Sequence, residues 1–236
     1  MFAPVIINGK ARSLSTYEPT RNVYASDYNM YCEANGKGWQ LDDWSNVCMI
    51  RDLAELLCRS TDTQKHYGTG PVGGSVRKNG ELVHKGEFWG SSDTDSSVKI
   101  FWLENISCNI SRYIRGILLS PIMVKMYPPY GNFENGIKSS TEDYVNTGLV
   151  IPGASGQVSF ITTTTINEYG TFPTGVGGSG NKFACDAIYY DFLNVFTYGA
   201  NYRNNDRYYS GLEHFSANST SRYDGCGGSL AYKQVN

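Results

Sequence analysis

The sequence predicts an α+β fold with two helices near its start, a small mixed or antiparallel sheet and long irregular loops. Three observations predict it. Apolar residues recur at helical spacing over residues 44–58, which indicates a core-facing helix. Beyond residue 58 the chain reads as short strands separated by Gly, Pro, Asn and Ser turns. The 236 residues include 26 Gly and 18 Tyr but only 18% charged residues, which is typical of a loop-rich domain with a packed core.

The first elements are expected to be short. Val5 to Asn8 are predicted to form a strand, followed by a loop. Ala25-Ser26-Asp27 are predicted to cap a helix that runs through Tyr31 and Cys32 and ends before Gly36.

The longer helix is predicted over residues 44–58. Asp42-Asp43 lead into it, and its apolar residues recur in steps of three and four, which places them on one face. These residues are Trp44, Val47, Cys48, Ile50, Leu53, Leu56 and Leu57. The side chains predicted to be buried are Trp44, Val47, Ile50, Leu53, Leu56, Phe101, Trp102, Leu103 and Leu230.

Charge and cysteine usage argue against several classes of function. The net charge is -2 and the 20 Lys and Arg residues are scattered, so we expect no nucleic-acid partner. The most apolar run, residues 113–126, contains Arg115 and Lys125, and we expect no membrane insertion. The opening residues lack the regions of a secretory signal peptide, so cytoplasmic synthesis is expected. The six widely spaced cysteines are expected to be buried free thiols rather than disulfides or a zinc cluster.

The sequence offers no arrangement typical of catalysis or metal binding. His66, His84 and His214 lack ligand spacing, and there is no Gly-x-Ser-x-Gly motif of a serine hydrolase. Asp93-Thr94-Asp95 alternate carboxylates but lack the Gly and the distal Glu of a calcium loop. Asp42-Asp43 are interpreted as the start of a helix rather than an acid–base pair. We therefore expect no enzyme activity, no metal and no cofactor.

Three segments in the first half of the chain form a recognisable series. The first is Tyr31-Cys32, followed by Gly-Lys-Gly-Trp-Gln-Leu-Asp-Asp-Trp at residues 36–44. The second is Phe88-Trp89-Gly90, and the third is residues 98–113. In this order they resemble the opening, the Trp-Gly turn and a degenerate form of the following strand in the formylglycine-generating-enzyme-like branch of the C-type lectin folds. The resemblance implies a C-type-lectin-like fold for residues 24–236.

Two short motifs stand in the C-terminal part of the chain. They are Tyr-Gly-Ala-Asn-Tyr-Arg-Asn-Asn at residues 198–205 and Gly-Gly-Ser-Leu-Ala-Tyr at residues 227–232. They resemble the two motifs that frame the variable region in the variable proteins of diversity-generating retroelements, a family that includes phage tail receptor-binding proteins and their bacterial relatives. Ala200 stands where the family has a second Gly, and Ser229 where it has Arg. The resemblance implies a variable ligand-binding region at about residues 198–226.

The residue types of this region agree with retroelement diversification, which in that family randomises adenines in Asn codons. Such codons can become most residue types but not Lys, Gln, Glu, Met or Trp. From Asn201 to Gly225 the single residue outside the reachable set is Glu213. Tyr, Arg, Asn and Ser also suit a binding surface, although each single Tyr is as well explained as a half-buried strand residue. The expected ligand-binding residues are Tyr202, Arg203, Asn204, Asp206, Arg207, Tyr208, Tyr209, His214, Ser221, Tyr223 and Asp224.

The resemblance implies a non-catalytic receptor-recognition protein, an adhesin at the phage tail tip that is made in the host cytoplasm and binds a bacterial surface protein or glycan. It also implies a homo-oligomer, often a trimer in the family, for which residues 1–23 are the candidate assembly segment. Two alternatives stay open: an undiversified lectin-like virion subunit and a divergent formylglycine-generating-type enzyme. The enzyme is less favoured because that family needs two neighbouring cysteines near the C-terminus. This chain has Cys226 there, and Cys185 lies far upstream in the sequence.

Overall fold

The computed structural model describes residues 2–71, 74–91, 97–120, 123–126, 144–153, 159–177, 187–190, 194–199, 215–218 and 224–234. This part of the chain is a mixed α+β structure, which confirms the predicted class. Its helices are α1 (Ala25–Glu33), α2 (Trp44–Cys58) and α3 (Gln64–Tyr67). Its strands are β1 (Val5–Ile7), β2 (Lys10–Arg12), β3 (Trp39–Leu41), β4 (Lys99–Ile100), β5 (Leu103–Glu104), β6 (Ser111–Ser120), β7 (Met123–Met126), β8 (Val145–Val150), β9 (Ser159–Asn167), β10 (Gly170–Val176), β11 (Ala187–Tyr190), β12 (Asn194–Tyr198), β13 (Phe215–Asn218), β14 (Cys226–Gly228) and β15 (Leu230–Tyr232).

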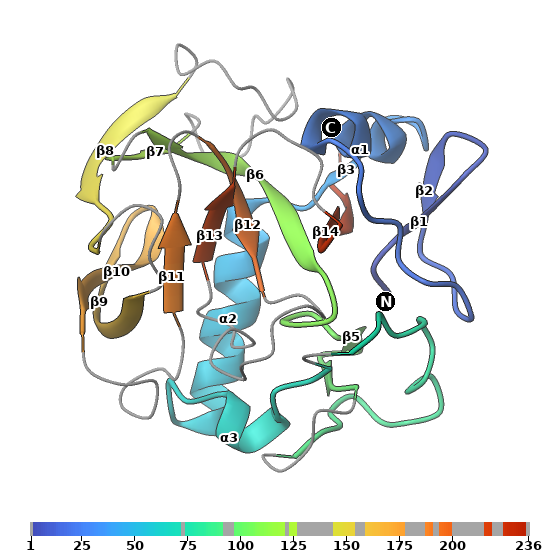
Figure 1. Ribbon diagram of the computed structural model, residues 1–236, viewed down its shortest axis with the longest axis horizontal. Coiled ribbons are helices and arrows are strands. Elements are labelled where there is room, and N and C mark those ends of the chain that lie inside the picture. The colour runs from blue at the N-terminus through green and yellow to red at the C-terminus, as the bar shows by residue number, and fades with distance from the viewer. Residues whose placement is uncertain are drawn as a thin grey trace.

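The strands form one nine-stranded sheet and three two-stranded sheets. The large sheet has the order β10-β9-β11-β13-β12-β6-β7-β8, and β14 pairs with β6 beside this path (Figure 1). Its pairs are antiparallel except for β11–β13 and β14–β6, which are parallel. The small sheets are β1–β2, β3–β15 and β4–β5. Small sheets match the expectation, and the nine-stranded sheet beside them is larger than the sequence predicts.

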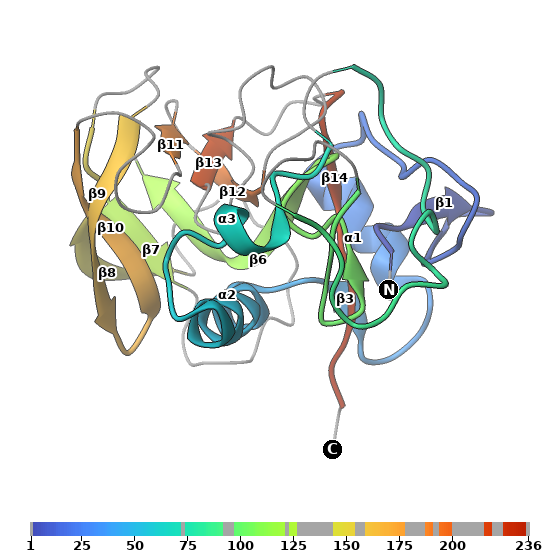
Figure 2. The ribbon, with the colours of Figure 1, turned by 90° about the horizontal axis from the view of Figure 1, so that it is seen from below.

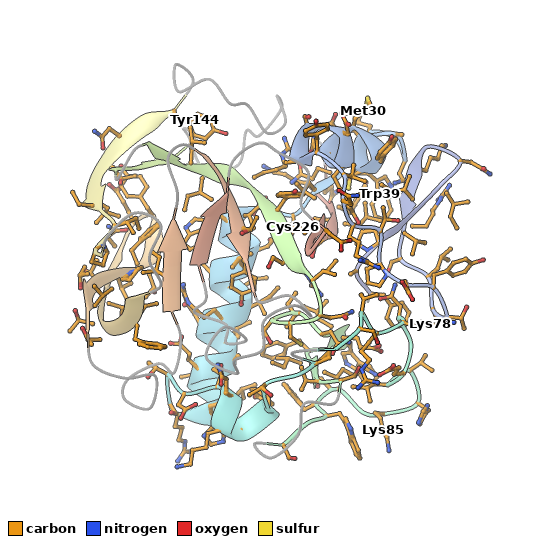
Figure 3. The ribbon with its side chains drawn as sticks, in the orientation of Figure 1. Met30, Trp39, Lys78, Lys85, Tyr144 and Cys226 are labelled. Atoms are coloured by element: carbon orange, nitrogen blue, oxygen red, sulfur yellow. The ribbon has the colours of Figure 1, made fainter. Side chains whose placement is uncertain are left out.

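Strand β6 organises the part of the sheet that matters for function. One of its edges pairs with β12. The opposite edge pairs with β14 at residues 111–113 and with β7 at residues 117–120. Between these two contacts the backbone N–H of Arg115 donates to the carbonyl oxygen of Asp42 at 3.0 Å. Figure 3 shows Cys226 of β14 beside β6, so β6 contacts both β14 and the residues that lead into α2.

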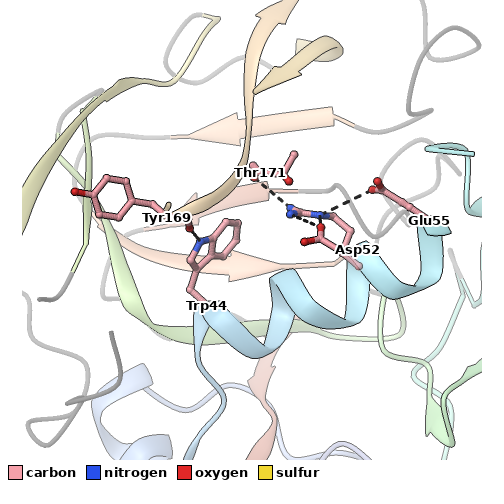
Figure 4. Close-up of polar contacts among 6 residues, drawn as sticks. Trp44, Asp52, Glu55, Tyr169 and Thr171 are labelled. Atoms are coloured by element: carbon pink, nitrogen blue, oxygen red, sulfur yellow. Dashed lines mark hydrogen bonds and ion pairs between the residues drawn. The ribbon is translucent and has the colours of Figure 1, made fainter. Parts of the chain in front are cut away.

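Helix α2 occupies the predicted range and lies on one side of the large sheet (Figure 2). The carboxylate of Asp43 accepts the backbone N–H of Asn46 at 3.1 Å and so caps the N-terminus of the helix. The side chain of Trp44 is 1% exposed and packs against Phe172 of β10. Its indole N–H donates to the carbonyl oxygen of Tyr169 at 2.7 Å (Figure 4). These contacts fix α2 to the β9–β10 pair.

The buried face of α2 is only partly the predicted one. Trp44 and Val47 are buried as expected, and Ile50 is half-buried. The prediction is wrong for Leu53 and Leu56, whose side chains are 44% and 72% exposed. The helix carries two apolar stripes, and the sequence alone does not show which of them faces the sheet.

A buried arginine decides which stripe faces inward. Arg51 is 0% exposed, and its guanidinium donates to the carbonyl oxygen of Thr171 at 3.2 Å. It also pairs with Asp52 at 2.9 Å and approaches Glu55 at 3.9 Å (Figure 4). Because these partners compensate its burial, Arg51 stands in the middle of the inner face and the leucines of the other stripe face outward.

Trp102 is predicted to be a core residue, and this prediction is wrong because its side chain is 54% exposed. Phe101 and Trp102 form the two-residue turn between β4 and β5, and their φ angles are 50° and 64°. Both positive angles are typical of the tight turn that fits a hairpin's twist. Phe101 is half-buried against the core. The ring of Trp102 instead faces the Lys99 ammonium group, whose Nζ lies 5.0 Å from the ring centroid. Of the other predicted core residues, Leu230 is buried and Leu103 is half-buried.

The remaining helices differ from expectation in detail. Helix α1 forms where predicted, but Tyr24 occupies its N-cap position and Asp27 lies in its first turn, where a carboxylate favours the helix dipole. The hydroxyl of Tyr28 donates to the carbonyl oxygen of Pro4 at 3.0 Å, which attaches the N-terminal segment to α1. Helix α3 was not expected because four residues give no periodic signal. Within the described residues no helix has the length and apolarity needed to cross a bilayer.

Free thiols occur at five described positions, and four of them are buried, as expected: Cys32, Cys48, Cys108 and Cys226. Cys58 is only half-buried. Cys185 lies outside the described residues.

Candidate ligand-binding site

The region expected to bind the ligand is described mainly at its two flanks. Ten predicted residues lie outside the described residues, and their exposure stays a prediction: Tyr202, Arg203, Asn204, Asp206, Arg207, Tyr208, Tyr209, His214, Ser221 and Tyr223. Residues 200–223 are called the binding segment below. Residues 197–199 and 225–230, which flank it, are called the frame.

Both parts of the frame meet on one residue of β6. Tyr198 of β12 pairs with Arg112 from one edge, and Gly227 of β14 pairs with Arg112 from the other edge. Every residue of the frame is buried, and Thr197 is 0% exposed. The two described flanks of the binding segment therefore lie on opposite edges of β6, beside the same residue (Figure 1).

Strand β13 adds an attachment within the binding segment. It runs antiparallel to β12, and Phe215 pairs with Tyr198. The connection from Gly199 to Phe215 thus has both of its ends at the same end of the sheet, beside the first residues of β6.

Two glycines of the frame are required by the packing around them. Gly199 has a φ of 74°, and a Cβ atom there would lie 3.0 Å from the backbone carbonyl group of Ser107. At Gly228 a Cβ atom would collide with the side chains of Leu41 and Tyr28. A side chain at either position would push β12 or β14 away from its neighbours.

The side chain of Arg112 joins the frame to the β5–β6 connection. Its Nη1 donates to the Ser229 hydroxyl at 3.2 Å, and its Nη2 donates to the carbonyl oxygens of Asn105 at 2.6 Å and Glu104 at 3.4 Å. Burial lowers the pKa of Arg112. An arginine at position 229 would bring a second guanidinium beside Arg112 and add a like charge to a buried site, whereas the Ser229 hydroxyl accepts a hydrogen bond there.

Asp224 is the predicted ligand-binding residue that the structure describes. Its side chain is 32% exposed, and its carboxylate pairs with Arg21 at 2.5 Å. Arg21 also approaches Glu18 at 3.6 Å. A ligand that binds Asp224 would therefore compete with Arg21 of the N-terminal segment.

A second polar group, the carboxylate of Asp42, lies next to the frame, and no sequence motif identifies it as a site. Asp42 is 9% exposed, and its Oδ1 accepts the backbone N–H of Asp43 at 3.1 Å and the side-chain amide of Asn46 at 2.8 Å. Burial raises the pKa of Asp42 to about 6. The sequence gives only a weak signal for Asp42. Asp43 alone is enough to cap α2, so the carboxylate beside it, that of Asp42, has no role in the cap.

Among the described residues, no group of three or more His, Cys, Asp and Glu side chains is arranged to hold a metal ion. Burial raises the pKa of the Cys226 thiol to about 12, and that of Cys108 to about 12 as well. A thiol with such a pKa is uncharged near neutral pH and is a weak nucleophile.

No protein-family model matches the chain, and a search of curated proteins finds no match. The function therefore has to be inferred from the residues and the geometry of this protein.

Proposed function

We propose that this protein is a non-catalytic recognition protein that binds its ligand through the binding segment, residues 200–223, together with Asp224 directly after it. The observation that carries the proposal is the frame: both flanks of this segment pair with Arg112 and are buried. A scaffold of this kind can hold a surface whose residues are replaceable, because the residues that form the core are separate from those that meet the ligand.

The composition of the binding segment supports the same proposal. It contains Tyr, Arg, Asn and Ser in close succession. Tyr gives a large and rigid contact area, Arg is common in binding hot spots, and Asn and Ser give adaptable hydrogen bonds.

The finer part of the proposal is a C-type-lectin-like fold of the kind used by variable proteins of diversity-generating retroelements. It is supported by the order of the similar motifs, residues 31–44, 88–90, 198–205 and 227–232. The required glycines of the frame, Gly199 and Gly228, fall in the two motifs that flank the variable region in that family. In this role the protein would be an adhesin of a phage tail tip that recognises a bacterial surface protein or glycan.

Sequencing the gene in many clonal isolates tests this proposal. If it holds, codons 201–225 vary far more than those of the frame, and a reverse-transcriptase gene with a near-copy of this stretch lies nearby. Equal variation along the whole gene, without such a copy, would favour an undiversified lectin-like virion subunit instead. Oxidase activity on a cysteine-containing peptide would favour the enzyme alternative.

A further inference from the structure

A cleft of about 420 Å³ lies beside the frame, between α2, the β4–β5 turn and β15. Figure 2 shows α2 and the C-terminal end of the chain on the same side of the molecule. The cleft is lined in part by Met49, Ile50 and Leu53 of α2 and by Phe101 of the turn. A volume of this size lies within the range of small-molecule sites, which is roughly 300–1,000 Å³.

The apolar walls of the cleft are exposed although they belong to large side chains. Met49 is 55% exposed and Leu53 is 44% exposed. Burying such side chains against an apolar partner is favourable, by about 25 cal/mol for each Å² removed from water. The walls therefore favour the apolar part of a ligand.

Polar groups of opposite charge, Asp42 and Arg112, also line the cleft, together with Ser229. Arg112 is 5% exposed, and within the described part of the chain its Nε has no hydrogen-bond partner. Asp42 uses Oδ1 for both of its hydrogen bonds from described residues, which leaves Oδ2 available as an acceptor. No ion pair joins the two side chains among the described residues, although their charges influence each other.

These features define the head group that would fit. A carboxylate would meet Arg112 but would be repelled by Asp42, and an ammonium group would meet the opposite conflict. A neutral group with both a donor and an acceptor satisfies the two residues at once.

We propose that this cleft binds a small amphipathic molecule, with an apolar body against α2 and the β4–β5 turn and a neutral hydrogen-bonding head against Asp42 and Arg112. None of the described residues that line the cleft belongs to the binding segment, so this proposal does not depend on whether residues 200–223 bind a receptor.

Three probes of equal chain length test the head-group preference: hexanamide, hexanoate and hexylammonium. The full chain, labelled with ¹³C at its methionine methyl groups, is titrated with each probe and followed by NMR. We expect hexanamide to shift the methyl signal of Met49, which lines the cleft. The signal of Met30, an exposed residue of α1, serves as the internal control and should not move. Equal or tighter binding of either charged probe overturns the proposal.

Matched variants test the location. Leu53→Trp fills the cleft and should weaken hexanamide binding at least tenfold. Leu56→Trp makes the same change on the same helix, outside the residues that line the cleft, and should leave binding within twofold. Unchanged binding by Leu53→Trp overturns the site. If no probe binds and Leu53→Trp instead lowers the mass measured by light scattering, the cleft is a contact between copies and the proposal is wrong.

The charge balance has its own test. Asp42→Asn keeps an acceptor for Asp43 and Asn46 but leaves Arg112 as the charged group of the pair. The preference should then change from hexanamide to hexanoate. A variant that still prefers hexanamide shows that Asp42 does not meet the head group and overturns that part of the proposal.

Discussion

Lys99 and Glu104 are partners across the β4–β5 pair, and they hold opposite parts of one segment, residues 80–85. The Glu104 carboxylate accepts three backbone N–H groups, from Gly80 at 2.9 Å, Glu81 at 3.2 Å and Leu82 at 3.2 Å. The Lys99 ammonium donates to the carbonyl oxygens of Leu82 at 2.7 Å and Lys85 at 3.0 Å. The backbone of this segment thus finds hydrogen-bond partners in two buried charged side chains rather than in a neighbouring strand or a helix.

The Lys99→Met variant should be destabilised by about 3 kcal/mol, because it leaves the carbonyl oxygens of Leu82 and Lys85 without their charged donor. Urea unfolding measures the loss. Lys78→Met is the matched control, since Lys78 is exposed in the same region (Figure 3), and it should change stability by less than about 0.5 kcal/mol. Similar losses in the two variants would contradict the structural role of Lys99.

The outward orientation of the second apolar stripe of α2 can be tested by truncation. Trp44→Ala should cost about 3–5 kcal/mol, because it removes a core aromatic and its hydrogen bond to Tyr169. Leu56→Ala should cost less than about 0.5 kcal/mol, because Leu56 is 72% exposed. Thermal unfolding followed by circular dichroism compares them. A large loss in Leu56→Ala would mean that another surface covers this stripe in solution.

Asp42 should make stability depend on pH. Its pKa is raised by burial from 3.8 to about 6, so the folded state prefers the protonated acid. This contribution to stability is complete below the unfolded pKa and is lost as the pH rises through about 6. Asp42→Asn should therefore be more stable than the wild type by up to about 3 kcal/mol at pH 7.5, and the difference should vanish below about pH 4. Urea titrations at a series of pH values measure it, and a difference that does not change with pH would show that Asp42 is not the titrating group.

The binding segment should be separable from the core. Simultaneous Ala substitution of Tyr202, Arg203 and Tyr223 is expected to leave the Tm nearly unchanged, because the buried frame holds the fold. The same variant should lose binding to cells of the host bacterium, since each hot-spot truncation costs roughly 2 kcal/mol or more. If the triple variant unfolds, these side chains are structural and the binding proposal fails.

Assembly is the remaining expectation from the resemblance. A homo-oligomer, such as a trimer, would strengthen weak single-site binding through multivalency. Light scattering on the full chain should give a mass above that of the 26.2 kDa monomer. A monomer at high concentration would argue against assembly through residues 1–23.

The two longer helices, α1 and α2, are the most predictable part of the fold. The spacing of apolar residues and the Asp43 cap gave α2 its observed bounds, Trp44–Cys58. The inner face of α2 could not be predicted, because Arg51 becomes a core residue only through Thr171, which lies far along the chain. The predicted burial of Trp102 is wrong because a large aromatic side chain normally indicates the core, whereas this one occupies a turn with positive φ.

For the candidate site, the sequence singles out glycines at the two flanks but not the contacts around them. Gly199 and Gly228 are required where the motifs placed them, since glycine leaves a strong local signal. The role of Arg112 was not predictable, because it depends on pairing with β12 and β14 from opposite edges of β6. The pairing of Asp224 with Arg21 is likewise a contact between distant parts of the chain.

The pairing of β15 with β3 bears on how the protein is made. Leu230 lies opposite Leu41, so β3, near the beginning of the fold, pairs with a strand near its end. Almost the whole domain must therefore be synthesised before β3 can pair with β15 and before β14 can pair with the first residues of β6. During that interval these edges stay open to incorrect pairing, which makes late synthesis the period in which chaperones would matter most.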